Sequence, residues 1–249
     1  MTTRLADLPE HARLISRLQT AVDLPPTAIQ ALLSLPVILQ QFGKGEDIVR
    51  ERERPTHVCL LLDGLGCRYR KVEPGSRQIL AFHIAGDILD LQSLHLSQTD
   101  HALATLTPTR VAFIPHEDLR QLVYSNPAVC HVLWRETLVD AAVYREWLWA
   151  IGQLGSYPRI ARLICELFVK HQLAGLVQGQ SFRLPLTQVD FADALGLTAV
   201  HVSRVLRELR REGLLQVRGG TVTILDWRRT AEAGLFDPTY LHTTQAQAA

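Results

Sequence analysis

The spacing of apolar residues changes along the chain, and each change predicts a different kind of element. Residues 4–34 repeat apolar positions at helical spacing, with a break at Pro25-Pro26. From residue 36 to residue 115 the pattern shortens to apolar or alternating segments separated by glycines. Short strands at such spacing are typical of an antiparallel sandwich or barrel. The segments that we predict as strands are 58–62, 78–84, 102–106 and 111–114.

Helical spacing returns between Pro127 and Gly152, and this helix is apolar on more than one side. Such a helix needs two partners. We expect one side to cover the β domain and the other to pair with the same helix of a second chain. Packing wholly within one chain is the alternative. A further helix is predicted at 158–171. The apolar positions of the long helix are Val132, Leu138, Val139, Ala142, Val143, Trp147 and Trp149.

Residues 184–224 predict two short helices, a tight turn and a β-hairpin, in that order. Thr187 has Asp190 three residues on, close to the pattern of a capping box. Gly196 lies where the first helix must end, and glycine tolerates the positive φ of that position. Thr198 can cap the second helix. The hairpin has Gly219-Gly220 at its turn, which predicts the wing of a winged helix-turn-helix.

The second helix of this unit has two unlike faces. Its inward face is apolar, and its outward face is polar and rich in arginine, which is what a DNA major groove accepts. An ordinary helical hairpin with a solvated arginine face is the alternative. The inward residues are Val202, Val205, Leu206 and Leu209, and the outward residues are His201, Ser203, Arg204, Arg207, Arg210 and Arg211.

Charge favours the DNA-binding interpretation. Residues 199–229 contain seven arginines and three acids, a net charge of +4, whereas the whole chain carries only +1. The positive charge is therefore concentrated where phosphate contacts would be made. A helix at 226–234 is also predicted.

Composition sets wider bounds. A chain of 249 residues with 47% hydrophobic and 20% charged residues is long enough for one large or two ordinary domains. No run of 18 apolar residues occurs, and the N-terminus has early acids, so we expect neither a membrane span nor a secretory signal. We therefore expect a cytoplasmic location.

Four cysteines (59, 67, 130 and 165) lack Cys-x-x-Cys spacing, which predicts reduced, mostly buried thiols. We place Cys59 and Cys67 on neighbouring strands, and a redox role for this pair is the alternative.

The order of β-barrel, long helix and winged helix-turn-helix resembles the Crp/Fnr family of bacterial transcription regulators. The resemblance rests on the segments Phe42-Gly43-Lys44-Gly45-Glu46, Gly64, Ala85-Gly86-Asp87 and, above all, 195–206. It implies an α+β fold with an antiparallel β-roll or jelly-roll sensor domain, a long dimerisation helix and a C-terminal winged helix-turn-helix. The implied divisions are an N-terminal helical segment (1–35), the cyclic-nucleotide-binding-like sensor (36–126), the dimerisation helix (127–154), the DNA-binding domain (155–235) and a frayed tail (236–249).

The resemblance also implies partners and DNA-contacting positions. The protein would be a homodimer that reads double-stranded DNA in successive major grooves and contacts RNA polymerase. Arg204 stands where the family has a guanine-reading arginine, whereas Val200 replaces the usual glutamate, so the half-site should differ from the common one. The predicted base contacts are Ala199, Val200, His201, Ser203 and Arg204, and the predicted phosphate contacts are Thr187, Thr198, Arg207 and Arg218.

The sensor region departs from the cyclic-nucleotide members, which have a Gly-Glu pair and a later Arg-Ser/Thr pair. Here Gly86 is followed by the shorter Asp87, and Asp100-His101 offers no arginine. A neutral histidine is a poor substitute for a fixed cation against phosphate. We therefore predict that the protein does not bind cyclic AMP, and take Gly86, Asp87, Asp100 and His101 as the candidate effector pocket. The N-terminal cysteine cluster of the iron–sulfur members is absent, so no cluster is predicted.

Three alternatives stay open from the sequence. A haem-bound sensor could use His83, His95 or His101. A cyclic-nucleotide-binding-like module could act on a protein partner, which would leave the arginine-rich region unexplained. A cupin-like β-barrel enzyme would need a His-x-His pair, and none occurs, so no catalytic residue and no metal site is predicted.

Overall fold

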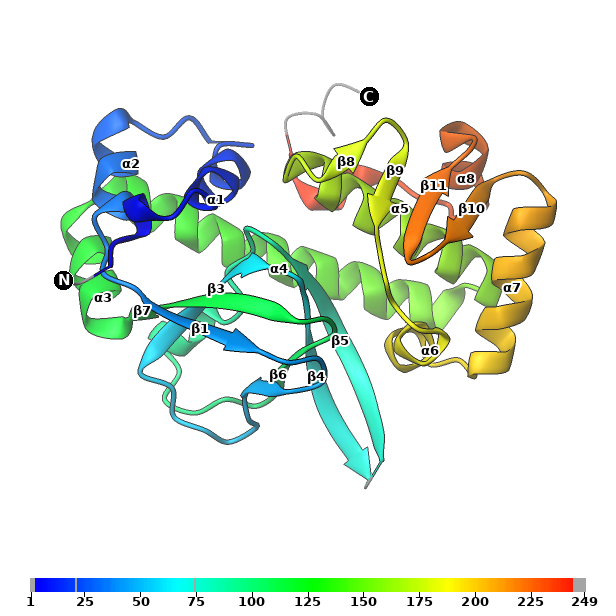
Figure 1. The fold of residues 1–249 in the computed structure, drawn as a ribbon, viewed down its shortest axis with the longest axis horizontal. Helices are drawn as coiled ribbons and strands as arrows, with labels where there is room; N and C mark the ends of the chain where they lie inside the picture. Colours follow the sequence, from blue (N-terminus) through cyan, green and yellow to red (C-terminus); the bar gives the residue numbers. More distant parts are fainter. Residues whose placement is uncertain (1–2, 21, 74, 244–249) are drawn as a thin grey trace.

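The computed structural model describes residues 3–20, 22–73 and 75–243, and shows a β-rich domain and a smaller mixed domain on either side of one long helix (Figure 1). The chain begins with a short 3₁₀ helix η1 (Leu5–Asp7) and helices α1 (His11–Leu18) and α2 (Pro26–Leu33). Pro26 is the first residue of α2, where its missing N–H is harmless. The predicted break at Pro25-Pro26 is confirmed.

The sensor domain is a roll of two antiparallel sheets. One sheet has the order β1 (Ile38–Phe42), β7 (Thr109–Pro115), β3 (His57–Asp63). The other has the order β2 (Asp47–Val49), β6 (Ala102–Thr105), β4 (Leu65–Glu73), β5 (Ser76–Ile84). The four predicted strands are confirmed as β3, β5, β6 and β7. A 3₁₀ helix η2 (Leu91–Leu94) and helix α3 (His116–Ser125) complete this domain.

Cys59 and Cys67 lie on strands that follow each other in the chain but belong to different sheets. The prediction that they lie on neighbouring strands is therefore wrong, because β3 pairs with β7 and β4 pairs with β5 and β6. Both thiols are buried and free. Burial raises the pKa of Cys59 above its ordinary value and that of Cys67 to about 12. Neither thiol has the thiolate character that redox chemistry needs.

Helix α4 (Pro127–Gln153) runs the length of the molecule between the two domains (Figure 1). The side chain of Asn126 accepts a hydrogen bond from the backbone N–H of Val129 and caps its start. One side of the helix is buried within the chain, as Val132 and Leu133 show. Other large apolar side chains of α4 remain exposed, namely Trp134, Leu138, Leu148 and Trp149.

The C-terminal domain contains the predicted winged unit and a second hairpin that the sequence did not predict. It consists of α5 (Ser156–Leu173), β8 (Val177–Gln178), β9 (Ser181–Arg183), α6 (Gln188–Leu195), α7 (Ala199–Arg211), β10 (Leu215–Arg218), β11 (Thr221–Ile224) and α8 (Trp227–Ala233). The four strands form one sheet in the order β10-β11-β9-β8. A single hydrophobic cluster joins this domain to the sensor, since Phe82 and Phe168 both belong to it.

The predicted frayed tail is wrong for residues 236–243. A 3₁₀ helix η3 (Pro238–Leu241) follows α8, and Leu241 and Thr243 are buried. The tail is held because the hydroxyl of Tyr240 donates to Glu166 Oε2 at 2.7 Å and Arg135 donates to the carbonyl of His242. Residues 244–249 of the predicted tail lie outside the described residues.

Candidate DNA-binding interface and sensor cavity

Local signals set where α6 begins and ends and where α7 begins. The hydroxyl of Thr187 accepts from the backbone N–H of Asp190 at 3.2 Å, and Asp190 Oδ2 accepts from the backbone N–H of Thr187 at 2.7 Å. This is the capping box that the sequence predicted. Gly196 ends α6 with φ +63°, and the hydroxyl of Thr198 accepts from the backbone N–H of His201 to begin α7. The start of α6 and the turn between α6 and α7 are therefore both specified by local residues.

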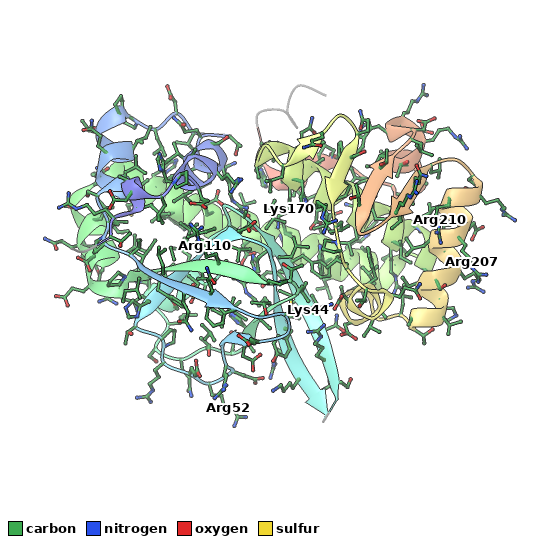
Figure 2. The ribbon with its side chains drawn as sticks, viewed as in Figure 1. Lys44, Arg52, Arg110, Lys170, Arg207 and Arg210 are labelled. Carbon is green, nitrogen blue, oxygen red and sulfur yellow. The ribbon has the colours of Figure 1, made fainter. Side chains whose placement is uncertain are left out.

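Helix α7 presents its polar face to solvent. Val202, Val205 and Leu209 are buried against the domain core, as predicted, and Leu206 is half-buried. On the other side, Val200 is 78% exposed, and His201 and Arg204 are exposed as well. Figure 2 shows Arg207 and Arg210 on α7, at the end of the molecule away from the sensor domain.

The arginines of this face keep their charges unneutralised. Within residues 3–20, 22–73 and 75–243, none of Arg204, Arg207, Arg211 and Arg218 takes part in an ion pair. Arg218 lies at the end of β10, next to the Gly219-Gly220 turn of the wing. Exposed cations without carboxylate partners can contact phosphates.

A cavity of about 390 Å³ lies where the sensor, α4 and α5 meet. We call it the sensor cavity. The predicted pocket residues Asp87, Asp100 and His101 all line it, but Gly86 does not. Gly86 instead forms a turn with φ +99°, packed against the backbone of Arg13. The prediction of Gly86 as a pocket residue is therefore wrong, because its role is conformational.

Asp87 binds cations from two other elements. Arg17 of α1 donates to its Oδ1, and the Lys170 ammonium of α5 lies 3.4 Å from its Oδ2. His83 of β5 adds Nδ1 at 3.5 Å from Oδ2. Lys170 also donates to the carbonyl of Phe82 at 2.9 Å and lies near the middle of the molecule (Figure 2). Burial, and after it the charge of Arg17, lowers the pKa of Lys170 to about 8.

A second buried arginine connects the sensor to α4. Arg68 of β4 is 3% exposed, and its Nη1 donates to Asp140 Oδ2 at 2.7 Å. The same guanidinium donates to the hydroxyl of Tyr144 and to the carbonyl of Leu89. Asp140 and Tyr144 both belong to α4, so the sheet and the long helix are joined through one buried cation.

Comparison with known proteins matches both domains to known families. A model of the cyclic nucleotide-binding domain matches residues 39–126, and a model of the Crp-like helix-turn-helix domain matches residues 158–232. The electron transport regulator A of Shewanella oneidensis is 26% identical over 183 residues, which cover 74% of this chain and 73% of that protein. The fumarate and nitrate reduction regulatory protein of Vibrio cholerae is similar to the same extent.

The chain belongs to the Crp/Fnr family. It is a DNA-binding transcription regulator of the Crp/Fnr type. Among solved structures, FixK2 from Bradyrhizobium japonicum superposes with a TM-score of 0.71 at 24% identity, over 79% of this chain and 96% of that one. The regulator CLP of Xanthomonas campestris gives 0.63 at 18% identity, over 81% and 100%. These two likenesses concern the fold.

The structure gathers the predicted base-reading residues of this Crp/Fnr protein on one surface. Ala199, Val200, His201, Ser203 and Arg204 all fall in the first half of α7. Their contacts with DNA stay predictions. Among the predicted phosphate contacts, the hydroxyl of Thr187 already donates to Asp190 Oδ2 at 2.7 Å, so it would have to exchange this bond for a phosphate.

The sequence did not point to the cations of the sensor cavity. Arg17, Arg68 and Lys170 come from three separate elements, α1, β4 and α5. None of them lies in a motif, and only the fold brings them together. Within the described part of the chain no group of three or more histidine, cysteine or acidic residues could hold a metal. None of the helices that the structure describes is long and apolar enough to span a membrane.

Proposed function

We propose that this Crp/Fnr regulator acts as a homodimer paired along α4, with one α7 helix in each half of a palindromic operator. Trp134, Leu138 and Leu148 support the pairing. They are exposed, and spacings of 4 and 14 residues put them on one face of the helix. Exposed apolar stripes of this kind are typical of helix pairing surfaces. Two-fold symmetry then sets the recognition helices about 34 Å apart, one turn of DNA.

Arg204 is the proposed reader of guanine, through bidentate hydrogen bonds to O6 and N7. The single observation that carries the function is the exposed α7 face with arginines that have no carboxylate partner in the described structure. Val200 has no acceptor for a cytosine amino group, but its exposed methyl groups can contact a thymine methyl. The half-site should therefore differ from that of family members with a glutamate at this position.

Selection of bound sequences from a random DNA pool tests this function. We expect a palindrome with a guanine in each half-site, and retardation of that fragment in gels that weakens steeply with salt. Failure to enrich any sequence at physiological salt would contradict the proposal.

For the sensor, we propose a signal other than cyclic AMP. Two observations support this. The segment around Asp100 and His101 supplies no arginine, and the carboxylate of Asp87 is already paired with Arg17 and Lys170. A ribose hydroxyl would have to compete with those cations. Calorimetric titration with cyclic AMP should give no binding heat, and micromolar binding would refute the argument.

The proposal also covers cofactors, enzyme activity, partners and location. We propose no haem and no iron–sulfur cluster; His83 is buried beside Asp87, and His101 is hydrogen-bonded to Asp100 and Gln92. We further propose that the protein is not an enzyme, that it contacts RNA polymerase when bound to its operator, and that it works in the cytoplasm, where the DNA is.

A further inference from the structure

The sensor cavity is built from more than the sensor domain. Arg17 of α1 and Leu241 of η3 both line it, and both lie outside the two ranges that match family models. Lys170 and Glu166 of α5 line it from the DNA-binding side. A molecule in this cavity would therefore touch the N-terminal segment, the sensor, the long helix and the DNA-binding domain at once.

Each of the four described cations that line the cavity has a carboxylate partner, with Asp87 shared by Arg17 and Lys170 and Glu136 shared by Arg17 and Arg135. Arg17 pairs with Asp87 and with Glu136, whose Oε2 lies 3.1 Å from its Nη2. Arg68 pairs with Asp140, and Lys170 with Asp87. An anionic ligand would have to displace one of these carboxylates and leave it buried without a partner. That loss is severe for a buried ion pair.

The acids of the cavity offer no free negative charge for a cationic ligand either. Glu166 accepts hydrogen bonds from Trp147 Nε1 at 3.0 Å and from the Tyr240 hydroxyl at 2.7 Å. Burial raises the pKa of this carboxyl above its ordinary value. Asp100 is hydrogen-bonded to His101, and its side chain is 88% exposed, so water rather than a cation screens its charge. Charge thus disfavours ions of both signs.

Much of the remaining lining is apolar, although Thr20, Gln92, Thr137, Tyr144 and Thr243 also line the cavity. Apolar surface comes from Phe82, Val139, Val143 and Trp147, among others. Arg68 and His83 also line the cavity, and Arg68 Nε and His83 Nε2 are buried atoms with no hydrogen-bond partner in the described structure; of the two, only His83 Nε2 can accept. Burial, and next the charge of Arg68, lowers the pKa of His83 well below its ordinary value, so the ring is neutral.

The neighbouring carboxylate sets the tautomer of His83. Nδ1 faces Asp87 Oδ2 at 3.5 Å, which favours the ring proton on Nδ1. Nε2 then carries the lone pair and can only accept a hydrogen bond. A buried acceptor without a partner is unfavourable, and a ligand O–H or N–H would relieve it.

We propose that the sensor cavity binds an uncharged, largely apolar small molecule that donates one hydrogen bond to His83 Nε2. The volume lies in the range of ordinary small-molecule sites, about 300–1,000 Å³. This inference rests on the proposed function, in which the cavity receives the signal. Because the cavity includes residues of α5 and η3, an occupied site stabilises the present docking of the DNA-binding domain on the sensor.

Equilibrium dialysis of the full chain against three naphthalene probes tests the proposal. 2-Naphthol is neutral and has a donor, 2-methoxynaphthalene is neutral without a donor, and 2-naphthyl phosphate is anionic. We expect 2-naphthol to bind at least about tenfold more tightly than the phosphate, a difference of about 1.4 kcal/mol. Equal or tighter binding of the phosphate, or no binding of 2-naphthol, would overturn the proposal.

Two cavity variants and one control variant locate the binding. Val143→Trp fills the cavity and should abolish 2-naphthol binding, while Val72→Trp, at an exposed position of β4, should leave it unchanged. His83→Leu should weaken 2-naphthol about tenfold and leave 2-methoxynaphthalene unaffected, as expected for loss of one hydrogen bond. Binding that survives Val143→Trp would place the probe elsewhere and refute the assignment. Binding of the operator is measured separately. If the protein binds its operator but not 2-naphthol, the ligand proposal fails while the proposed regulator function stands.

Discussion

Arg77 of β5 donates from Nη2 to Asp190 Oδ1 at 2.7 Å and thereby joins the sensor sheet to the first helix of the helix-turn-helix. The same guanidinium donates from Nε to Asp193 Oδ2 at 2.8 Å. Asp190 is also the capping-box residue of α6. The same carboxylate therefore caps the start of the helix and forms an ion pair with Arg77 of the sensor domain. Gln78 adds a hydrogen bond to the carbonyl of Ala194 at 3.1 Å. Figure 1 shows α6 beside β5.

Replacement of Arg77 should loosen this contact. Arg77→Ala leaves two partly buried carboxylates without their cation, so we expect a loss of about 1.5–3 kcal/mol in the free energy of unfolding. Urea denaturation measures it. Arg70→Ala is the matched control, because Arg70 lies on β4, is 59% exposed and pairs with Glu51 only at 3.4 Å. The control should change stability by less than about 1 kcal/mol. Equal losses in both variants would contradict a specific link to α6.

Replacement of Val200 should change the operator rather than abolish binding. Val200→Glu restores an acceptor for a cytosine amino group at an exposed position of α7. Sequences selected by this variant should gain a cytosine in each half-site, whereas Val200→Ala should not gain it. An unchanged selected sequence for Val200→Glu would show that residue 200 does not face a base.

His171 should make the protein sensitive to acid. This ring is buried against Phe182, and burial lowers the pKa of His171 from 6.5 to about 4. Between pH 4 and pH 6.5 the unfolded chain therefore binds more protons at His171 than the native protein does. The stability that the neutral ring contributes is present above pH 6.5 and is lost as pH falls from 6.5 toward 4. Buried Asp90, whose pKa burial raises to about 6, acts in the opposite direction.

A variant isolates the contribution of His171 from that of other titrating groups. His171→Leu should gain stability relative to the wild type as pH falls from 6.5 to 4, at up to about 1.4 kcal/mol per pH unit. Urea denaturation at several pH values gives this difference. If the difference between the two proteins is the same at both ends of this range, His171 titrates normally in the native state.

The C-terminal tail should contribute to stability through Tyr240. Its hydroxyl donates to Glu166, which lies 3% exposed in the core. Tyr240→Phe removes one of the donors to that carboxyl and should reduce the free energy of unfolding by about 1–3 kcal/mol. Tyr124→Phe serves as control, since Tyr124 is 74% exposed. If Tyr240→Phe leaves the free energy of unfolding unchanged, the tail is not docked in solution.

Local signals made much of the DNA-binding unit predictable. Thr187, Asp190, Gly196, Thr198 and the Gly219-Gly220 turn each specify backbone geometry within a few residues, and the structure has each as predicted. The strands were harder. Strand β1 is almost wholly exposed, and β4 is dense in charge, so neither shows the alternation that predicts a half-buried strand.

The sensor cavity was only partly predictable, for a different reason. Asp87, Asp100 and His101 were found through a resemblance, but Arg17 and Lys170 are separated from Asp87 by 70 and 83 residues. No periodicity or motif links such positions; only the tertiary fold does. The tail was mispredicted because its polar composition gives no sign that Tyr240 and Leu241 find buried partners.

The central claim is that Arg204 reads a base on the operator of a Crp/Fnr regulator. Fluorescence anisotropy on the selected operator and on random DNA of equal length tests it most directly. We predict that Arg204→Ala weakens operator binding by about 1–3 kcal/mol and random-DNA binding far less. Arg228→Ala, at an exposed position on α8, should leave the preference for the operator intact. An equal loss on both DNAs would contradict the claim and show that Arg204 holds phosphate.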